Sequence, residues 1–377
     1  MIRQAIFKQI LNWVELGLIP DFLVRRAIRR LCTKRLAEVD RGNCEANLRQ
    51  LETFVEQMNS SCIAPIPEVA NEQHYTVPPA LFELILGKRL KYSSCVWPEG
   101  VTSLDQAEEA ALRATCERAE IENGMRVLEL GCGWGAVSLW IAEHYTNCEI
   151  TAVSNSASQR EYILAKAERS GLDRNLTVIT ADMNDFDIGQ RFDRVISLEM
   201  FEHMRNYREL LRRISNWLTP EGKLFIHIFC HRECAYEFVD RGETDWMSRY
   251  FFSGGIMPSD NLLYRFPENL RVVKQWRWDG THYQRTAEAW VANMDRNREK
   301  LLPVLAKTYG SQDAARWFYR WRMLFLAGAE LFGYQRGQQW WVAHYLLEQQ
   351  AAQHATGDLW QNEAGLSERV SELASRK

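Results

Sequence analysis

The stretch VLELGCGWGAVSLWIAEHY, residues 127–145, constrains this chain more than any other. Residues 127–130 form a short apolar run, which predicts a buried parallel strand. Gly131, Gly133 and Gly135 follow at once, and an apolar-periodic helix comes next. Glycines let the backbone turn sharply and let a ligand lie against bare backbone, while the helix start offers free amides. The stretch therefore predicts a strand, a ligand-binding turn and a helix, and a purely structural turn is the alternative.

Composition narrows the class of protein. A chain of 377 residues can form one large domain or two modest ones. Its net charge of −3 gives no reason to expect nucleic acid as a partner. No apolar run approaches the length of a membrane span, and the start of the chain lacks the features of a signal peptide. The nine cysteines form no paired framework, so we expect reduced thiols and a cytoplasmic protein.

Further apolar runs alternate with helical patterns. They predict strands at 149–154, 176–182, 192–198 and 222–231, a strand and loop over 271–286, and a closing strand from residue 340. This alternation predicts an α/β fold, a doubly wound and mostly parallel sheet with helices on both faces.

The same pass along the chain predicts its domain organisation, in three parts. They are an N-terminal helical cap (1–73), the main domain (74–352, with its core at 102–230 and a lid and helices at 231–335), and a mobile polar tail (353–377). Within the lid and helices, residues 245–263 show no period and predict an irregular lid with a Gly-Gly hinge. Two long helices are expected over 287–310 and 313–337. Basic residues in the cap leave peripheral membrane contact open, although a solvated helix face is the simpler interpretation.

Several motifs in combination carry a family resemblance. They are HYTVPPALF (74–82), YSSC (92–95), ELGCGWG (129–135), MFEH (200–203) and WMSRYFFSGGIMPS (246–259). Together they resemble the cyclopropane fatty acid synthase superfamily of S-adenosylmethionine (SAM) dependent methyltransferases. LEMFEHMRNY, WRMLFLAGAELFGY and VELGLIP are most similar to the coclaurine N-methyltransferase group. The resemblance implies the class I methyltransferase fold, a Rossmann-like and mostly parallel seven-stranded sheet, with SAM as the cofactor.

The resemblance also implies where the cofactor is held. In this family the glycines contact the methionine part of SAM, and the motif acid, here Glu129, lies near its amino group. Polar side chains stand at the end of the next predicted strand, 149–154. An acidic residue at the end of the third predicted strand would accept a hydrogen bond from the adenine amino group, and the alternative is that it caps a turn. The expected cofactor-binding residues are Ser93, Ser94, Glu129, Gly131, Gly133, Gly135, Ser154, Asn155, Gln159, Asp182 and Met183.

Glu199, Glu202 and His203 lie on the turn that leaves the fourth strand, at the edge where ligands bind such sheets. Two carboxylates so close raise each other's pKa, which makes one of them a base near neutrality, and they attract a cationic amine. The N-methyltransferase group has its catalytic Glu-x-x-Glu-His set at these positions. We therefore expect these three residues to be catalytic and a small amine to be methylated on nitrogen, with a structural helix cap as the alternative.

A second function remains open, the SAM-dependent methylation or cyclopropanation of unsaturated acyl chains of phospholipid. Cyclopropane synthases hold a bicarbonate with a cysteine, a glutamate, a histidine and a tyrosine. Cys95, Glu202 and His227 match the first three, whereas Met323 and Leu324 stand at the place of the tyrosine. A SAM-binding protein without catalysis is a third interpretation.

Aromatic side chains and matches to the family predict a substrate pocket. The expected residues are Tyr75, Cys95, Trp97, His227, Tyr283, Trp321 and Glu330. Residues 227–234 contain two histidines and two cysteines, but positions 227 and 230 of a strand point to opposite faces, so no metal is expected. The sequence leaves a homodimer open and gives a small-molecule amine or a lipid as the partner.

Overall fold

The computed structural model describes residues 2–65, 77–239 and 246–350. The expected pocket residue Tyr75 and the expected mobile tail, 353–377, therefore lie outside the described residues. All nine cysteines are free, as the sequence predicts. Across the described ranges, no helix combines the length and the apolar character that crossing a membrane requires.

A seven-stranded sheet forms the centre of the fold. Its strands stand in the order β3 (Leu176–Thr180), β2 (Glu149–Ser154), β1 (Arg126–Leu130), β4 (Phe192–Leu198), β5 (Leu218–His231), β9 (Trp340–Gln349), β8 (Leu270–Trp278). Only β9 runs antiparallel to its two neighbours. The expected mostly parallel, seven-stranded sheet is thus confirmed. A second, two-stranded sheet joins β6 (Tyr236–Glu237) to β7 (Ile256–Met257).

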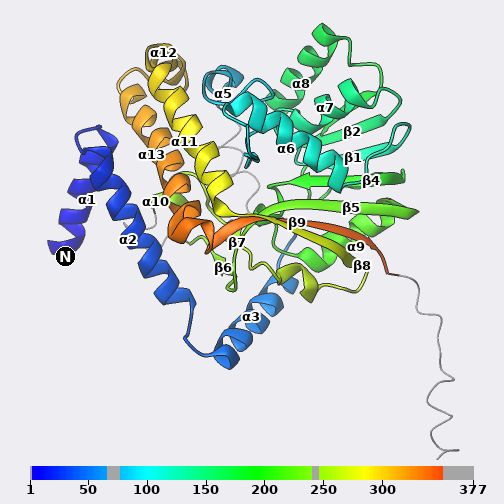
Figure 1. Cartoon of the computed structure of the whole chain (residues 1–377), viewed down its shortest axis with the longest axis horizontal. Helices are drawn as coiled ribbons and strands as arrows, with labels where there is room; N and C mark the ends of the chain where they lie inside the picture. The colour runs from blue at the N-terminus through cyan, green and yellow to red at the C-terminus, as the bar shows by residue number, and fades with distance from the viewer. Residues whose placement is uncertain (1, 66–76, 240–245, 351–377) are drawn as a thin grey trace, which may run out of the picture.

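Helices cover both faces of the large sheet, as the alternating pattern predicts. Figure 1 shows α6 (Leu104–Arg118), α7 (Ala136–His144) and α8 (Ala157–Ser170) on one side and α9 (Tyr207–Trp217) on the other. The buried side chains of α9 recur at helical spacing: Tyr207, Leu210, Leu211, Ile214 and Trp217. The central strands carry apolar runs because helices bury them on both faces.

The helices between β8 and β9 differ from the expectation. The structure has α11 (Gly280–Arg296), α12 (Arg298–Tyr309) and α13 (Ala314–Phe332), in place of a loop and two long helices. Helix α11 begins early because the Asp279 side chain accepts a hydrogen bond from Thr281 N. The expected helix over 287–310 is broken at Asn297, whose side-chain amide donates to the Leu84 carbonyl at 2.8 Å, at the end of α5 (Pro79–Ile85).

The expected irregular lid contains short elements and is largely packed. Helix α10 (Trp246–Tyr250), strand β7 and the 3-10 turn η3 (Leu262–Arg265) lie within it. Trp246, Phe251, Ile256 and Met257 are all buried. The aromatic residues of this segment therefore belong mainly to the hydrophobic core of the protein.

The N-terminal segment is helical, as expected, with α1 (Ile2–Glu15), α2 (Asp21–Val39) and α3 (Cys44–Asn59). Figure 1 shows α1 and α2 beside α13, and α3 near α9. The buried carboxylate of Glu15 accepts hydrogen bonds from Arg316 and Arg320 of α13 and from Trp246, at 2.9–3.0 Å. Burial raises the pKa of Glu15, but the bonds from Arg320, Trp246 and Arg316 outweigh it, so this pKa is lowered.

The anchoring of the N-terminal helices gives a first prediction. Glu15→Ala leaves two arginines without their carboxylate, so we expect a loss of about 3–5 kcal/mol of stability in chemical denaturation. Glu38→Ala, which removes an exposed partner of Lys34 on α2, should cost less than about 1 kcal/mol.

The acid dependence provides the check on this anchor. A carboxyl group whose pKa is lowered by folding stabilises the protein above its unfolded pKa and loses this effect as the pH falls through its folded pKa. The difference between wild type and Glu15→Ala should therefore shrink at acid pH. Equal losses for Glu15→Ala and Glu38→Ala would show that Glu15 does not anchor the helices.

Candidate active site

The turn after β1 has all three of its glycines at positive φ: 78° at Gly131, 52° at Gly133 and 80° at Gly135. A Cβ at Gly131 would lie 2.9 Å from Met200 Cβ, and one at Gly135 would lie 2.8 Å from Ile163 Cγ1. At Gly133 a Cβ would have no protein atom within 4 Å. Close packing therefore explains two of the glycines, while Gly133 faces open space.

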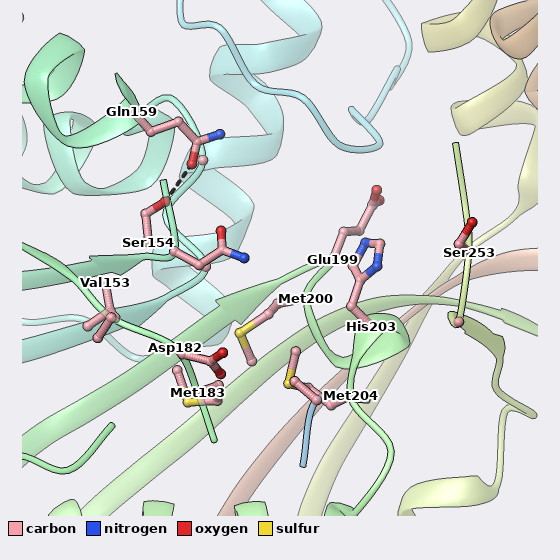
Figure 2. Close-up of a pocket in the computed structure, with 16 residues that line it drawn as sticks. Val153, Ser154, Gln159, Asp182, Met183, Glu199, Met200, His203, Met204 and Ser253 are labelled. Carbon is pink, nitrogen blue, oxygen red and sulfur yellow. Dashed lines mark hydrogen bonds between the residues drawn. The ribbon is translucent and has the colours of Figure 1, made fainter. Parts of the chain in front are cut away.

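That space is a cleft of about 760 Å³ at the carboxyl ends of the central strands, here called the polar cleft. Seven of the expected cofactor residues line it: Gly131, Gly133, Ser154, Asn155, Gln159, Asp182 and Met183. In Figure 2, Ser154, Gln159 and Asp182 lie on one side of the cleft, and Glu199 and His203 on the other.

Local hydrogen bonds position the side chains of the polar cleft. The Ser154 hydroxyl donates to Gln159 Oε1 at 2.6 Å. One oxygen of Asp182 accepts from Asn184 N at 2.8 Å, so the turn-cap role is present even though Asp182 also lines the cleft. The Asn184 amide pairs with the backbone of Ala64, which supplies part of the cleft wall. Periodicity gives no sign of this contribution from the N-terminal segment.

The other expected cofactor residues lie behind the cleft lining. Glu129 is buried and faces α7, where the Ser138 hydroxyl donates to its carboxylate; burial raises the pKa of Glu129 to about 7. The hydroxyl of Ser93 accepts a hydrogen bond from the Lys91 ammonium, and Ser94 N donates to the Glu199 carboxylate. Ser94 thus contacts Glu199 directly, and Ser93 contacts Lys91.

A second cleft, of about 860 Å³, lies mainly between α11, α13 and the 246–259 segment and is here called the apolar cleft. Its lining includes Tyr92, Phe229, Phe252, Tyr283, Trp290, Leu324, Phe325 and Phe332. Glu199 and His203 line both clefts, and Glu202 lines the apolar one. The expected catalytic cluster therefore stands where the two clefts meet.

Glu199 is held more firmly than its neighbours. Its backbone has φ of 46°, in the left-handed region, and its N–H donates to the His227 carbonyl at 2.8 Å. Its carboxylate accepts from Ser94 N at 2.9 Å and from the Tyr283 hydroxyl at 2.7 Å, and it lies 3.1 Å from His227 Nε2. The pKa of Glu199 is raised by burial, and the Lys91 charge and the hydrogen bonds from Ser94 and Tyr283 offset only part of this rise.

Glu202 stands in a different environment. It is 1% exposed, and within the described part of the chain neither of its carboxyl oxygens has a hydrogen-bond partner. Burial and the neighbouring Glu199 raise the pKa of Glu202 well above its usual range. The His203 ring stacks on Phe252 with 5.4 Å between the ring centroids. Glu202 is therefore a buried acid without a fixed partner, on the wall of an aromatic cleft.

The expected substrate-pocket residues are not all in this cleft. Tyr283 lines it, whereas Cys95 and Trp97 contact α11 through the Thr286 hydroxyl, at 3.2 and 3.0 Å. Trp321 has no exposed surface and packs on Phe82, Phe251 and Phe325, as a core residue of α13 does.

Glu330 faces α2, where it pairs with Arg25 at 2.9 Å and Arg29 at 2.6 Å. Helical periodicity puts Glu330 on another side of α13 from Phe325 and Phe332, which line the apolar cleft. The same spacing could have indicated these two cleft residues, which the sequence analysis did not select.

Comparisons with known proteins show a family to which this chain is similar over most of its length. The family model for mycolic acid cyclopropane synthetase matches residues 66–333. (S)-Coclaurine N-methyltransferase of Thalictrum flavum subsp. glaucum is 36% identical over 350 residues, which cover 92% of this chain and 97% of that protein. The enzyme of the same name from Papaver somniferum is 35% identical over 344 residues, 90% of this chain and 98% of that protein.

A solved structure is also similar over nearly the whole chain. The crystal structure of coclaurine N-methyltransferase bound to N-methylheliamine and SAH superposes with a TM-score of 0.86 at 34% identity. It covers 92% of this chain and 100% of that one.

The glycine turn gives a second prediction. In Gly133→Ala the new methyl group would enter the polar cleft, so the affinity for SAM should fall by about tenfold or more, the equivalent of about 1.4 kcal/mol. Gly171→Ala is a matched control, since φ is 66° at Gly171, a Cβ there meets nothing within 4 Å, and the residue caps α8 away from the cleft.

Both variants carry the same kind of backbone strain, about 1–2 kcal/mol, so stability should fall similarly in the two. Isothermal titration with SAM and with S-adenosylhomocysteine measures the difference. Unchanged binding by a folded Gly133→Ala protein would exclude this turn from the cofactor site.

Proposed function

The chain belongs to the mycolic acid cyclopropane synthetase family and is a SAM-dependent methyltransferase, and we propose that it methylates the nitrogen of a small amine. The observation that carries this proposal is the junction of the two clefts. The polar cleft and the apolar cleft share Glu199 and His203. Glu202 lines the apolar cleft, and its carboxyl oxygens have no hydrogen-bond partner among the described residues. A methyl donor and an amine in these clefts would meet at the acidic cluster.

The polar cleft suits SAM in shape and in donor chemistry. We assign the amino-acid part of the cofactor to the bare backbone at Gly133, the ribose to Ser154, Asn155 and Gln159, and the adenine to Asp182. The bound cofactor supplies a methyl group on a positively charged sulfur, which leaves as a neutral thioether. Carboxylates at the junction favour that positive charge.

The apolar cleft suits an amine that carries an aromatic or other apolar body. Its walls include Phe229, Phe252, Trp290 and Phe332, whose ring faces attract cations and whose surfaces exclude water. Glu202 gives the ammonium group of such a ligand a partner within this cleft. We therefore propose an amine with an apolar body, rather than a small polar amine, as the acceptor.

An amine must present a lone pair before it can accept a methyl group. One proton of its ammonium form has to leave, and we assign this proton to Glu202, because its carboxyl has no competing donor. Glu199 already accepts hydrogen bonds, so it acts as a fixed negative group that orients the amine. The residues thereby hold the nitrogen in line with the methyl group, which is the main task in such a displacement.

The assignment of Glu202 gives a third prediction. Glu202→Gln keeps the shape of the side chain and removes its basicity, so kcat should fall by roughly a hundredfold while SAM affinity hardly changes. Heliamine, the unmethylated counterpart of the N-methylheliamine bound by the crystallised relative, is a suitable acceptor. Glu120→Gln is a control for the same substitution outside the site, since Glu120 pairs with Lys223 and Lys274 before β1 and lines neither cleft.

The pH profile tests the same residue independently. The pKa of Glu202 is raised, so the group is protonated at low pH and becomes a base as the pH rises through this pKa. The wild-type rate should therefore rise with pH, and this limb should disappear in Glu202→Gln. If Glu202→Gln retains wild-type turnover of heliamine from pH 6 to 9, Glu202 is not the base.

The alternative, chemistry on unsaturated acyl chains, requires a bicarbonate site that these residues do not fit. His227 uses both ring nitrogens, one toward Glu199 and the other toward His344. The Cys95 thiol is buried against the Ser93 carbonyl. Leu324, at the expected place of a tyrosine, lines the apolar cleft with a hydrocarbon side chain. These contacts support the amine rather than the lipid.

A fourth prediction follows from this misfit. Turnover of heliamine should be unchanged in degassed buffer with or without added bicarbonate, and vesicles of unsaturated phosphatidylethanolamine should give no methylated product. Mass spectrometry detects both products. Bicarbonate-stimulated conversion of the vesicle lipid would instead favour the acyl-chain reaction.

A further inference from the structure

A chain of hydrogen bonds leads from Glu199 across β5 and β9 to Arg118 of α6. His227 Nε2 lies 3.1 Å from Glu199 Oε1, and His227 Nδ1 lies 2.9 Å from His344 Nε2. His344 Nδ1 in turn lies 2.7 Å from Nη1 of Arg118. The two histidines stand directly opposite each other on β5 and β9, and neither has exposed surface. The bond between the two histidines is therefore fully buried, whereas Glu199 and Arg118 at the two ends are partly exposed.

The chemistry of arginine fixes the direction of every bond in this chain. A guanidinium group can only donate, so Nδ1 of His344 must accept. A neutral His344 then carries its proton on Nε2 and donates to His227, which for the same reason carries its own on Nε2 and donates to Glu199. If Glu199 were protonated and donated to His227, each neutral histidine would carry its proton on Nδ1. The Nδ1–H of His344 would then face an N–H of Arg118, and two donors cannot form a hydrogen bond.

Burial favours the neutral form of both histidines, which is the form that this direction requires. Burial lowers the pKa of His227 well below its usual range, and the charges of Lys91 and Arg118 act in the same sense. Burial also lowers the pKa of His344, together with His227, Arg118 and Lys91. Arg118 itself is held over the rings of Trp276 and Trp278, at 5.4 and 5.2 Å from their centroids.

We propose that Arg118, His344 and His227 are positioning residues that hold Glu199 as an oriented carboxylate throughout turnover. The proposal rests on the proposed function, because it explains why Glu199 stays an acceptor while Glu202 exchanges the proton. Four further titratable groups face Glu199: Lys91 from the loop before α6, His203 and Glu202 from the turn after β4, and Tyr283 from α11. These groups are unchanged in every variant below, so a difference between pH profiles arises from the hydrogen bonds that join Arg118, His344, His227 and Glu199.

A first experiment determines the direction of these hydrogen bonds in the protein alone, with no methyl-accepting substrate added. In ¹⁵N-histidine-labelled wild-type protein, NMR should show His227 and His344 as neutral Nε2–H tautomers from pH 5.5 to 8. Arg118→Met removes the donor that sets the direction, and His344 should then populate the Nδ1–H form. A wild-type His344 that carries its proton on Nδ1, or is charged at pH 7, would overturn the proposal.

A second experiment reads the effect on the reaction with heliamine and SAM. His344→Leu breaks the chain, so Glu199 should take up a proton more easily and must lose it, as Glu202 does, before the reaction; the acidic limb should then lie about one pH unit higher, with a rate about tenfold lower near neutrality that recovers at high pH. His344→Gln should restore the wild-type profile, since its amide oxygen accepts from Arg118 and its amide nitrogen donates to His227.

Arg277→Met is the matched control. Arg277 stands on β8 between Trp276 and Trp278 and lies over Trp341, but it pairs with Asp260 and not with His344. Its loss should leave the shape of the pH profile unchanged. A rate loss in His344→Leu that is uniform from pH 6 to 9, or that His344→Gln does not restore, would show a merely structural role. Failure of the wild type to methylate heliamine would instead contradict the proposed function and leave the tautomer result standing.

Discussion

The hydrogen bonds that converge on Glu199 join the parts of this protein that are far apart in sequence. Ser94 lies in the loop between α5 and α6, His227 lies on β5, and Tyr283 lies on α11. The left-handed backbone of a non-glycine residue costs about 1–3 kcal/mol, and it persists only where the surroundings fix it. Because each donor belongs to a different element, the geometry at Glu199 depends on how the helical layer sits on the sheet.

The same two layers, the sheet and the helices packed on it, supply the two clefts of the site. The strand ends and the glycine turn offer bare backbone and polar side chains, whereas α11 and α13 offer aromatic walls. The proposed reaction between a charged cofactor and an apolar amine needs both environments side by side, because the reacting atoms must come within about 3–3.5 Å of each other. The N-terminal helices contribute indirectly, since Glu15 binds two arginines of α13, the helix that carries Phe325 and Phe332.

The sequence predicts the local features well because local patterns produce them. The strands and the turn at Gly131 follow from apolar runs and glycine spacing. The break at Asn297 does not, because it depends on a carbonyl at Leu84, more than two hundred residues earlier in the chain. The spacing of Glu199 and Glu202 places both on one turn, but it cannot distinguish them, since their different surroundings come from distant segments.

The contrast between the two glutamates also bears on how one family scaffold can serve different acceptors. A buried carboxyl without a partner, as at Glu202, is unfavourable unless it is protonated or a ligand satisfies it. An ammonium group satisfies such a carboxyl and delivers the proton that must leave, whereas an unsaturated acyl chain offers it no hydrogen bond. With His227 committed to Glu199 and His344, Glu202 is an acid at this junction whose carboxyl oxygens have no partner within the described residues, and such a group suits a cation. We propose that the choice between nitrogen and carbon acceptors depends on which polar groups the fold leaves without a partner beside the aromatic wall, and among the described residues these include both carboxyl oxygens of Glu202.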